Sequence, residues 1–401
     1  MRIALISEHA SPLAALGGED AGGQNTHVAE LAAALADAGN DVRVYTRRDD
    51  PALPECVAVR PGVTVVHVPA GPAEQVPKDD LLPYMGAFGD WLAAAWGGDW
   101  RPDVAHAHFW MSGLATVSAA QQTGVPVVQT YHALGVVKRR HQGDKDTSPA
   151  QRIGYERAVG RAVDAVVSQC RDETAELLRM GVPANRIALI PSGVDHERFT
   201  PDGPAEPREP GRPRILSVGR FVERKGFLDL VRALPAVPGA ECVIVGGVPG
   251  DPLAGRLREL AAELGVADRL RLVGAVKPGD MARWYRSADV LAATPWYEPF
   301  GLTPLEAMAC GVPVVGTAVG GLRDTVVDGL TGDLVPPRDP RALGLALRRL
   351  LRDPVRRLAY GSAALDRARN CYPWSRAADQ LSTLYARVSG VRDRETTGAV
   401  A

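Results

Sequence analysis

The sequence lacks the patterns that mark several classes of protein. Its five cysteines are scattered without a CxxC pair, so neither a zinc ribbon nor a disulfide framework is expected. The formal net charge of −1 gives no overall attraction to nucleic acid or to an anionic membrane. No apolar run approaches membrane-spanning length, and the N-terminal MRIALISEHASP turns polar too early for a signal peptide. We therefore expect a soluble, cytoplasmic protein that binds no nucleic acid and has no transmembrane segment.

Aromatic residues are also scarce, at 5%, whereas 42 glycines and 32 prolines suit many short loops between packed elements. A chain of 401 residues is too long for one ordinary core and predicts two domains. The segment 196–213 includes FTPDGPAEPREPGRP, which is dense in proline, glycine and charge, and this composition predicts an interdomain linker. The first domain then spans 1–195 and the second 214–371, and we expect the tail 391–401 to be disordered.

Each predicted domain alternates apolar strands with helices. In the first, residues 2–7 form a continuous apolar strand, the glycine-rich loop 17–25 follows, and residues 27–38 have helical periodicity. This layout can bind a phosphate or nucleotide, with a plain flexible loop as the alternative, but it lacks the GxGxxG spacing of dinucleotide sites. The alternation predicts the α/β class, with two Rossmann-like domains built on parallel sheets. Further strands are predicted at 42–46, 63–68, 104–108, 125–130, 165–168, 187–190, 214–218, 240–246, 270–274, 288–292, 312–315 and 331–335, and further helices at 79–96, 173–180, 253–264, 340–351 and 354–368.

The stretch Pro295–Gly321 has the layout of an α/β crossover. Glu298 precedes a proline, which disfavours α geometry, so Glu298 is expected in an extended loop. Pro304 suits the first turn of a helix because its missing N–H would have no partner there. Gly311 ends the predicted helix, and a short buried strand follows.

The start of that helix places hydrogen-bond donors beside carboxylates. Free N–H groups near Phe300, Gly301 and Leu302 would point out of a helix N-terminus, where phosphate binds. Glu298 lies before these donors and Glu306 about one turn behind them, so both carboxylates could bind hydroxyls. A helix with an acidic first turn, stabilised by its dipole, is the alternative interpretation.

The string Glu298-Pro-Phe-Gly-Leu-Thr-Pro-Leu-Glu306 resembles the donor-site signature of the retaining glycosyltransferases of family 4, in which seven residues separate two glutamates. The resemblance covers residues 1–390 and implies the GT-B architecture, with two Rossmann-like domains facing a central cleft. It also implies transfer of a hexosyl group from a nucleotide diphosphate sugar to an acceptor hydroxyl with retained configuration. The segment 372–390 resembles the C-terminal helix that in this family crosses back onto the first domain.

The resemblance assigns roles on the donor side. Arg220 and Lys225 match two cations that balance the charge building on the leaving diphosphate, in place of a divalent metal. Glu298 is implied to bind sugar hydroxyls and Glu306 the ribose, while the backbone around Val276 holds the nucleotide base. The other residues implied to bind the donor are Gly22, Gly23, Phe300, Gly301, Leu302 and Thr303.

Histidines mark the ends of two strands of the first domain. His106 and His108 point the same way from a strand, which suggests a metal site, but no third ligand stands at a usable spacing and zinc needs three or four. We therefore predict no metal. The string HAHFWMSG instead resembles an acceptor-side segment of the sucrose-phosphate synthase and mycothiol glycosyltransferase branches. His132 matches the Thr-x-His pattern of the family and is implied to reach the sugar and the reacting centre.

The acceptor side departs from the mycothiol pattern. Lys78 and Arg152 fall where those enzymes place basic residues around an acceptor phosphate, but Phe109 and Ala133 replace neighbouring polar positions. The basic run 138–141, in a predicted long loop, is either a solvated charge run or a patch for an anionic acceptor or lipid headgroup, which would allow peripheral membrane contact. The residues implied to contact the acceptor are Asn25, Lys78, Phe109, Trp110 and Arg152.

These features predict a metal-independent front-face transfer without a cofactor, because a diphosphate oxygen can take the acceptor proton. The first-domain motifs favour UDP-glucose or UDP-N-acetylglucosamine as donor, and a GDP-mannose-dependent mannosyltransferase is the main alternative. A GT-B nucleotide-sugar 2-epimerase, a glycoside hydrolase with two carboxylates and a non-catalytic binding protein are further alternatives. The sequence leaves open the oligomeric state and the acceptor, which could be a sugar phosphate, a cyclitol, an aminocyclitol or a lipid-linked glycan.

Overall fold

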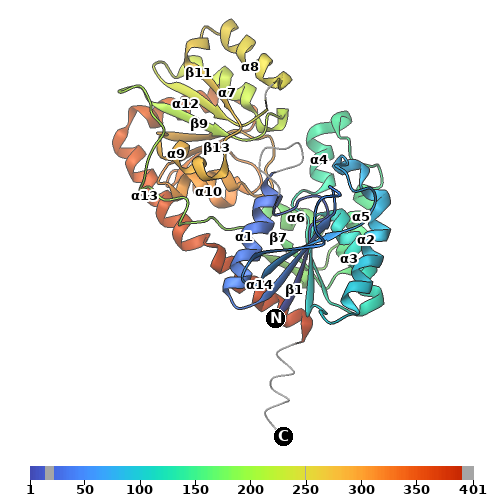
Figure 1. Ribbon diagram of the computed structural model, residues 1–401. Helices are drawn as coiled ribbons and strands as arrows, with labels where there is room; N and C mark the ends of the chain where they lie inside the picture. Colours follow the sequence, from blue (N-terminus) through green and yellow to red (C-terminus); the bar gives the residue numbers. More distant parts are fainter. Residues whose placement is uncertain (14–21, 249, 391–401) are drawn as a thin grey trace. The chain divides into compact units, whose positions relative to one another are not determined.

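The computed structural model describes residues 1–13, 22–248 and 250–390 (Figure 1). The chain divides into two units, one formed by Met1–Pro191 with the chain from Trp374 onward, the other by Ser192–Pro373. We call them unit 1 and unit 2. Most of the predicted glycine-rich loop and the predicted tail 391–401 lie outside the described residues.

Unit 1 is built on a sheet whose central strand is buried on both faces. The strands are β1 (Arg2–Ile6), β2 (Asp41–Arg47), β3 (Cys56–Arg60), β4 (Val63–Val68), β5 (Val104–His108), β6 (Val127–Thr130), β7 (Ala165–Ser168) and β8 (Ile187–Leu189). Their order is β3-β4-β2-β1-β5-β6-β7-β8, and every pair is parallel except β3 with β4. Leu5 of β1 pairs with Val44 on one side and with His106 on the other, so the C-terminal ends of β1, β5 and β6 share one edge.

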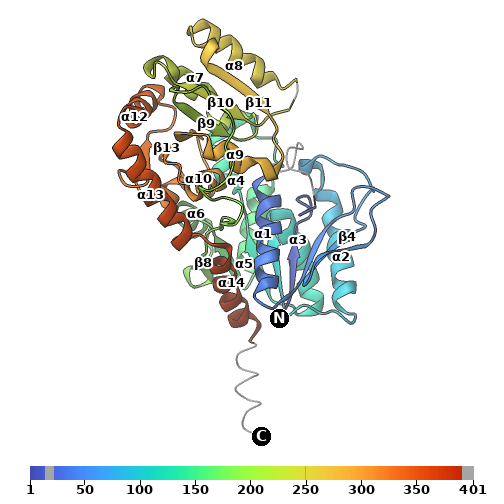
Figure 2. The ribbon, with the colours of Figure 1, turned by 60° about the vertical axis from the view of Figure 1, so that its left-hand side comes forward.

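Helices cover both faces of that sheet. They are α1 (Gly23–Asp37), α2 (Met85–Trp96), α3 (Trp110–Thr123), α4 (Gly135–Gln142), α5 (Arg152–Ala162), α6 (Arg171–Arg179) and α14 (Trp374–Ser389). One apolar cluster joins α2, α3 and α5 to one face of the sheet. A second joins α1 and α14 to the opposite face, and the two helices lie side by side in both views (Figures 1 and 2). The C-terminal helix is therefore part of unit 1.

Unit 2 contains an all-parallel sheet between two helical layers. Its strands are β9 (Arg214–Val218), β10 (Glu241–Val245), β11 (Leu270–Gly274), β12 (Val290–Ala293), β13 (Val314–Thr317) and β14 (Gly332–Val335), in the order β11-β10-β9-β12-β13-β14. Its helices are α7 (Phe227–Ala233), α8 (Pro252–Glu263), α9 (Met281–Arg286), α10 (Leu302–Ala309), α11 (Leu322–Thr325), α12 (Pro340–Arg352) and α13 (Pro354–Cys371). Helices α7, α8 and α12 pack on one face, and α9, α10 and α13 on the other.

The predicted linker differs from the structure. Residues 196–213 belong to unit 2, and the boundary lies between Pro191 and Ser192 rather than after residue 195. The Glu206 amide donates to the Arg283 carbonyl at 3.0 Å, and Arg286 Nε donates to the Pro204 carbonyl at 2.8 Å. The proline-rich composition was misleading because backbone carbonyls of an extended segment remain available to arginines of a neighbouring helix.

Local structure also differs from prediction at several places in unit 1, where helices α3 and α5 were not predicted. The basic run 138–141, predicted in a long loop, lies in α4, which is too short to show clear apolar periodicity. The predicted helix 79–96 begins only at Met85, because Pro83 falls in one of the two short 3₁₀ turns that precede it. Strand β3 was missed because it is a largely exposed edge strand. Within the described residues no helix is long and apolar enough to cross a membrane.

Candidate functional site

In unit 2, the loop from β12 to α10 brings Glu298 to the C-terminal edge of the sheet. Helix α10 starts after Gly301, whose φ of 95° disfavours any residue with a Cβ. Because this N-cap residue has no side chain, it leaves the first N–H groups of the helix uncapped. The helix therefore presents the backbone donors that the sequence predicts near Phe300, Gly301 and Leu302.

Two glycines fix the position of that loop. The Gly321 amide donates to the Glu298 carbonyl at 3.0 Å. A Cβ on Gly320 would lie 2.0 Å from the Glu298 carbonyl oxygen, and a Cβ on Gly321 would lie 2.2 Å from that of Phe300. The approach is so close that only glycine fits at either position.

Glu298 forms an ion pair with Lys225. Lys225 Nζ lies 2.6 Å from Glu298 Oε2, and both side chains are mostly buried. Burial raises the pKa of Glu298, but Lys225, Arg224 and Arg220 outweigh it and hold that pKa below its usual value. Burial lowers the pKa of Lys225 despite the nearby carboxylate. The sequence placed both residues at the site but did not predict that they pair.

The other predicted donor residues differ in their burial and in whether they line the cavity beside this pair. Thr303 lines a small cavity together with Lys225 and Glu298, whereas Arg220 is exposed and Val276 is partly buried. Glu306 accepts a hydrogen bond from the Tyr285 hydroxyl at 2.6 Å, a contact the sequence did not reveal. Unit 2 thus combines cations, backbone N–H donors and a carboxylate, which suits an anion next to a polyhydroxylated group.

In unit 1, His132 lies two residues beyond the end of β6. Its φ is 58°, and the Ala133 amide donates to the Tyr131 carbonyl at 2.7 Å, so the chain makes a tight γ-turn centred on His132. Such backbone geometry is strained for a residue other than glycine and often occurs at functional sites.

Three more histidines surround His132. His108 Nδ1 lies 2.9 Å from His132 Nε2, and the ring of His27 lies 4.8 Å from that of His132. The ring centres of His106 and His108 lie 4.3 Å apart with the rings tilted, and the two side chains point the same way from β5, as the sequence predicted. Burial is the main cause that lowers the pKa of each, to about 3 for His27 and His106 and well below the usual value for the other two. All four rings are therefore neutral near pH 7.

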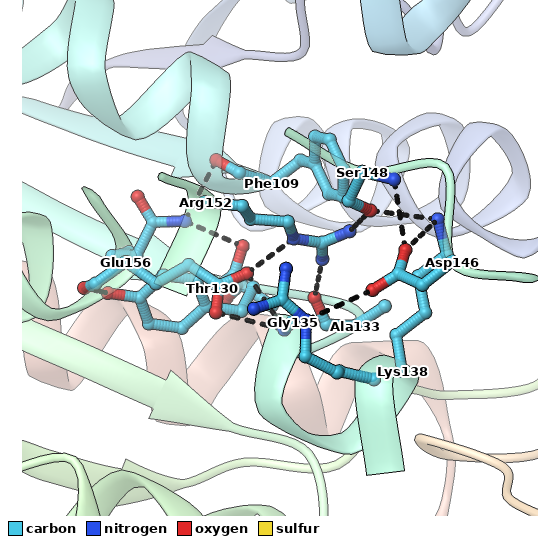
Figure 3. A network of polar contacts seen from close by, with 12 residues as sticks. Phe109, Thr130, Ala133, Gly135, Lys138, Asp146, Ser148, Arg152 and Glu156 are labelled. Atoms are coloured by element: carbon cyan, nitrogen blue, oxygen red, sulfur yellow. Dashed lines mark hydrogen bonds and ion pairs between the residues drawn. The ribbon is translucent and has the colours of Figure 1, made fainter. Parts of the chain in front are cut away.

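Arg152 occupies the centre of a buried polar network (Figure 3). Each of its three side-chain nitrogens donates a hydrogen bond: Nε to Glu156 Oε1 at 2.8 Å, Nη1 to Ser148 Oγ at 3.1 Å and Nη2 to the Ala133 carbonyl at 2.5 Å. The guanidinium also lies 5.1 Å from the ring centre of Phe109. The charge of Arg152 is thus compensated within the protein.

The partner of Arg152 has a second function in this network. Glu156 accepts from the Gly135 amide with both oxygens, at 3.0 and 2.9 Å, and so holds the first residue of α4 (Figure 3). Burial raises the pKa of Glu156, and Arg152 acts in the opposite direction. Lys138 donates to Ser148 Oγ at 2.8 Å and pairs with Asp146 at 3.0 Å. The network links the turn after His132 to α4 and α5.

The remaining predicted residues of unit 1 lie at the same edge or beneath it. Asn25 is buried; its Oδ1 accepts from the Gly22 amide at 2.9 Å and its Nδ2 donates to the Ser11 carbonyl at 3.0 Å. Gly22 is the N-cap of α1, and Gly23 is its first residue. Trp110 is 1% exposed and stacks on Tyr155 at 5.9 Å, while Lys78 begins a 3₁₀ turn. Their roles toward donor or acceptor stay predictions.

Sequence reasoning missed two residues that the structure places at this edge. His27 lies in the first turns of α1, and Glu156 lies in α5 and holds Arg152. Glu156 follows Arg152 by four residues, a spacing that already indicated an ion pair on one helix face. His27 offered no such signal, because its neighbours in space come from β5 and from the turn after β6.

Comparisons with known proteins now place the chain in a family. Residues 22–193 match the family described as "Glycosyl transferase 4-like domain", and residues 201–367 match "Glycosyl transferases group 1". The D-inositol 3-phosphate glycosyltransferase of Xylanimonas cellulosilytica is 40% identical over 407 residues, covering 97% of each chain. The chain belongs to glycosyltransferase family 4. This confirms the predicted family and the predicted transferase activity.

Other relatives of this glycosyltransferase agree. The D-inositol 3-phosphate glycosyltransferase of Thermobispora bispora is 38% identical over 96% of this chain and 94% of its own. A solved sucrose-phosphate synthase from Thermosynechococcus elongatus superposes with a TM-score of 0.89 at 35% identity, covering 97% and 99% of the two chains. Anabaena HepE, solved in complex with UDP-glucose, shares the fold. It superposes with a TM-score of 0.73 at 17% identity, covering 96% of this chain and 100% of its own. The predicted GT-B class with two parallel-sheet α/β domains is confirmed.

Proposed function

We propose that this glycosyltransferase moves a hexosyl group, of the glucose or N-acetylglucosamine type, from a UDP-linked sugar to an acceptor hydroxyl with retained configuration. The observation that carries the proposal is the Lys225–Glu298 pair beside the uncapped start of α10. A diphosphate would draw Lys225, and the hydroxyls of the attached sugar would take the carboxylate. The choice of UDP rests on the first-domain motifs, and HepE of the same fold has been solved with UDP-glucose.

The proposed chemistry needs no metal. When the sugar–phosphate bond breaks, its electron pair passes to the diphosphate, where Lys225, Arg220 and the α10 N–H groups stabilise the new charge. The acceptor oxygen attacks the sugar from the face that the diphosphate leaves, and the acceptor proton passes to a diphosphate oxygen. Glu298 holds the sugar hydroxyls. We propose that His132 positions the sugar at the reacting centre.

The acceptor is proposed to be a hydroxyl compound whose recognition does not depend on a phosphate held by Arg152. The family relatives are named for D-inositol 3-phosphate. In this chain all three side-chain nitrogens of Arg152 already donate hydrogen bonds, and Phe109 and Ala133 offer no hydroxyl beside it. With any active donor, D-inositol 3-phosphate should therefore show no advantage over unphosphorylated inositol. A strong preference for the phosphorylated compound would contradict this part of the proposal.

Initial-rate measurements test the function. UDP-glucose, UDP-N-acetylglucosamine and GDP-mannose are each supplied with an acceptor panel in the presence of EDTA, and release of the nucleoside diphosphate and the anomeric NMR signal of the product are followed. We expect turnover with a UDP-sugar and an α-linked product. Turnover with GDP-mannose alone would favour the mannosyltransferase alternative, and free isomerised donor without acceptor would favour the 2-epimerase. Near-native rates in folded Glu298→Ala or Arg220→Ala protein would contradict the site assignment.

A further inference from the structure

Three histidines of unit 1 converge from three separate elements. His27 lies on α1, His108 is the last residue of β5, and His132 forms the turn after β6. One ligand nitrogen from each lies within 4.8 Å of the other two. The proposed reaction uses His132 only, so the arrangement of the other two rings is not explained by it.

The spacing of the nitrogens is close to what a metal ion requires. A tetrahedral zinc ion with Zn–N distances of about 2.0–2.1 Å holds its ligand nitrogens about 3.3 Å apart. His108 Nδ1 and His132 Nε2 lie 2.9 Å apart, so they need only separate by a few tenths of an ångström. The ring of His27 lies 5.5 Å from that of His108 and 4.8 Å from that of His132, so it completes a triangle.

The chemistry of these three rings also suits a metal ion. Neutral imidazole is a common metal ligand, and each of the three rings offers one ligand nitrogen to the cluster. His106 is excluded as a ligand, because its nitrogens bond the Tyr385 hydroxyl at 2.6 Å and Thr130 Oγ1 at 2.8 Å. Those bonds fix the ring that supports His108.

We propose that His27, His108 and His132 bind one transition-metal ion, with zinc as the chemically preferred ion for an all-imidazole site. His27 and His108 are buried whereas His132 is only partly so, which leaves a fourth position for water or hydroxide. Hydroxide at that position would offset part of the charge that the buried site receives.

The ion is not a participant in the transfer reaction. Because the ion would hold the His132 ring, which is proposed to position the sugar, binding is expected to inhibit transfer, and removal of the ion with a chelator is expected to restore activity. This consequence rests on the proposed function, whereas binding of the ion does not.

Binding is tested with the full chain after chelator treatment. Co²⁺ should give the intense ligand-field absorption of a four-coordinate site at one ion per chain, and Zn²⁺ should displace it. His27→Gln should weaken Zn²⁺ binding by at least ~100-fold, since loss of a ligand exceeds the effect of losing an outer-shell partner. His141→Gln, which removes a histidine of α4 from the same unit, should bind as wild type does. Wild type that binds neither ion up to millimolar concentration, or His27→Gln that binds normally, would overturn the proposal.

A second readout needs no variant. In ¹⁵N-labelled wild type, Zn²⁺ should shift the imidazole nitrogens of His27, His108 and His132 and leave those of His67, which bonds the Pro54 carbonyl elsewhere in unit 1. Shifts confined to other histidines would contradict the site. Transfer rates separate this proposal from the function: relative to its own rate without metal, His27→Gln should lose inhibition by Zn²⁺. Absence of transfer with every donor, while the Co²⁺ spectrum is intact, would reject the proposed function alone.

Discussion

Lys225 Nζ lies 2.6 Å from Glu298 Oε2, so the cation proposed for the diphosphate and the carboxylate proposed for the sugar neutralise each other before any donor is bound. Both groups are mostly buried, and a buried charge without a partner is costly. Donor binding must therefore separate the pair while giving each member a new partner. A nucleotide without a sugar can satisfy only the lysine.

Replacing the carboxylate should separate binding from chemistry. Glu298→Gln frees Lys225 from its competitor, so UDP should bind about tenfold more tightly than to wild type, which is the lower end of the roughly 1.5–3 kcal/mol that a charged hydrogen bond is worth. Transfer should slow by at least ~100-fold, the effect typical of losing a group that stabilises charge in the transition state. Calorimetry and initial rates provide the measurements. Lys225→Met is the matched variant and should weaken UDP binding; equal weakening by both variants would argue against the division of roles.

The glycine contacts predict a sharp steric effect. Gly321→Ala places a Cβ 2.2 Å from the Phe300 carbonyl oxygen, so the loop before α10 must shift and donor affinity should fall by at least about tenfold. Gly255→Ala in α8 is the control, since a Cβ there meets nothing within 4 Å and alanine favours a helix. UDP titration of both folded variants measures the effect. Unchanged affinity in Gly321→Ala would show that the position of the loop does not determine donor binding.

The buried pair in unit 1 predicts strongly non-additive stabilities. Arg152→Met leaves Glu156 buried without its cation and should cost about 3–5 kcal/mol of unfolding free energy. Glu156→Gln in the same chain removes the stranded charge and keeps an acceptor for the Gly135 amide, so the double variant should recover a large part of the loss. Urea unfolding of the four proteins gives the coupling. Additive effects would mean that Arg152 is not held mainly by Glu156, and would restore it as a candidate phosphate ligand.

Glu173 predicts a pH dependence of stability. Burial is the main cause that raises its pKa from 4.5 to about 7, with Glu156 adding to the effect. Because the folded-state pKa is the higher one, its stabilising contribution is complete below about pH 4.5 and is lost as the pH rises through 7. Glu173→Gln should therefore match wild type at pH 4.5 and exceed it at pH 8 by up to about 3 kcal/mol. Melting temperatures of both proteins between pH 4.5 and pH 8 measure this effect. A difference between the two proteins that stays constant with pH would contradict the raised pKa of Glu173.

The sequence predicted well those features that local patterns encode. The loop holding Glu298 lies between β12 and α10, the helix that starts near Pro304 is α10, and the following buried strand is β13. These elements were predictable because proline, glycine and apolar runs determine local geometry. Local patterns gave wrong predictions for residues 196–213 and for α4. There, contacts with distant elements decide the structure, and composition carries no record of them.

The two sites show the same limit. Lys225 and Glu298 are 73 residues apart, so their pairing depends on the neighbouring positions of β9 and β12 in the sheet. The sequence analysis predicted no metal because it considered spacing along the chain only, and that spacing offered no third ligand beside His106 and His108. His132 lies at the same sheet edge because β6 is the neighbour of β5, so the strand order could have indicated that His132 lies near His108. The position of His27 beside them could not have been found without the fold.

The most direct test of the donor assignment is thermal unfolding of the purified protein with UDP, GDP, ADP and their sugars, each with EDTA or with magnesium. A ligand that binds only the folded state raises the melting temperature by mass action. We predict a shift with UDP and UDP-sugars that does not depend on magnesium, that is lost in Lys225→Met and that persists for UDP in Glu298→Gln. A shift with GDP alone would mean that the donor carries GDP rather than UDP. No shift with any nucleotide in folded protein would contradict the transfer mechanism proposed for unit 2.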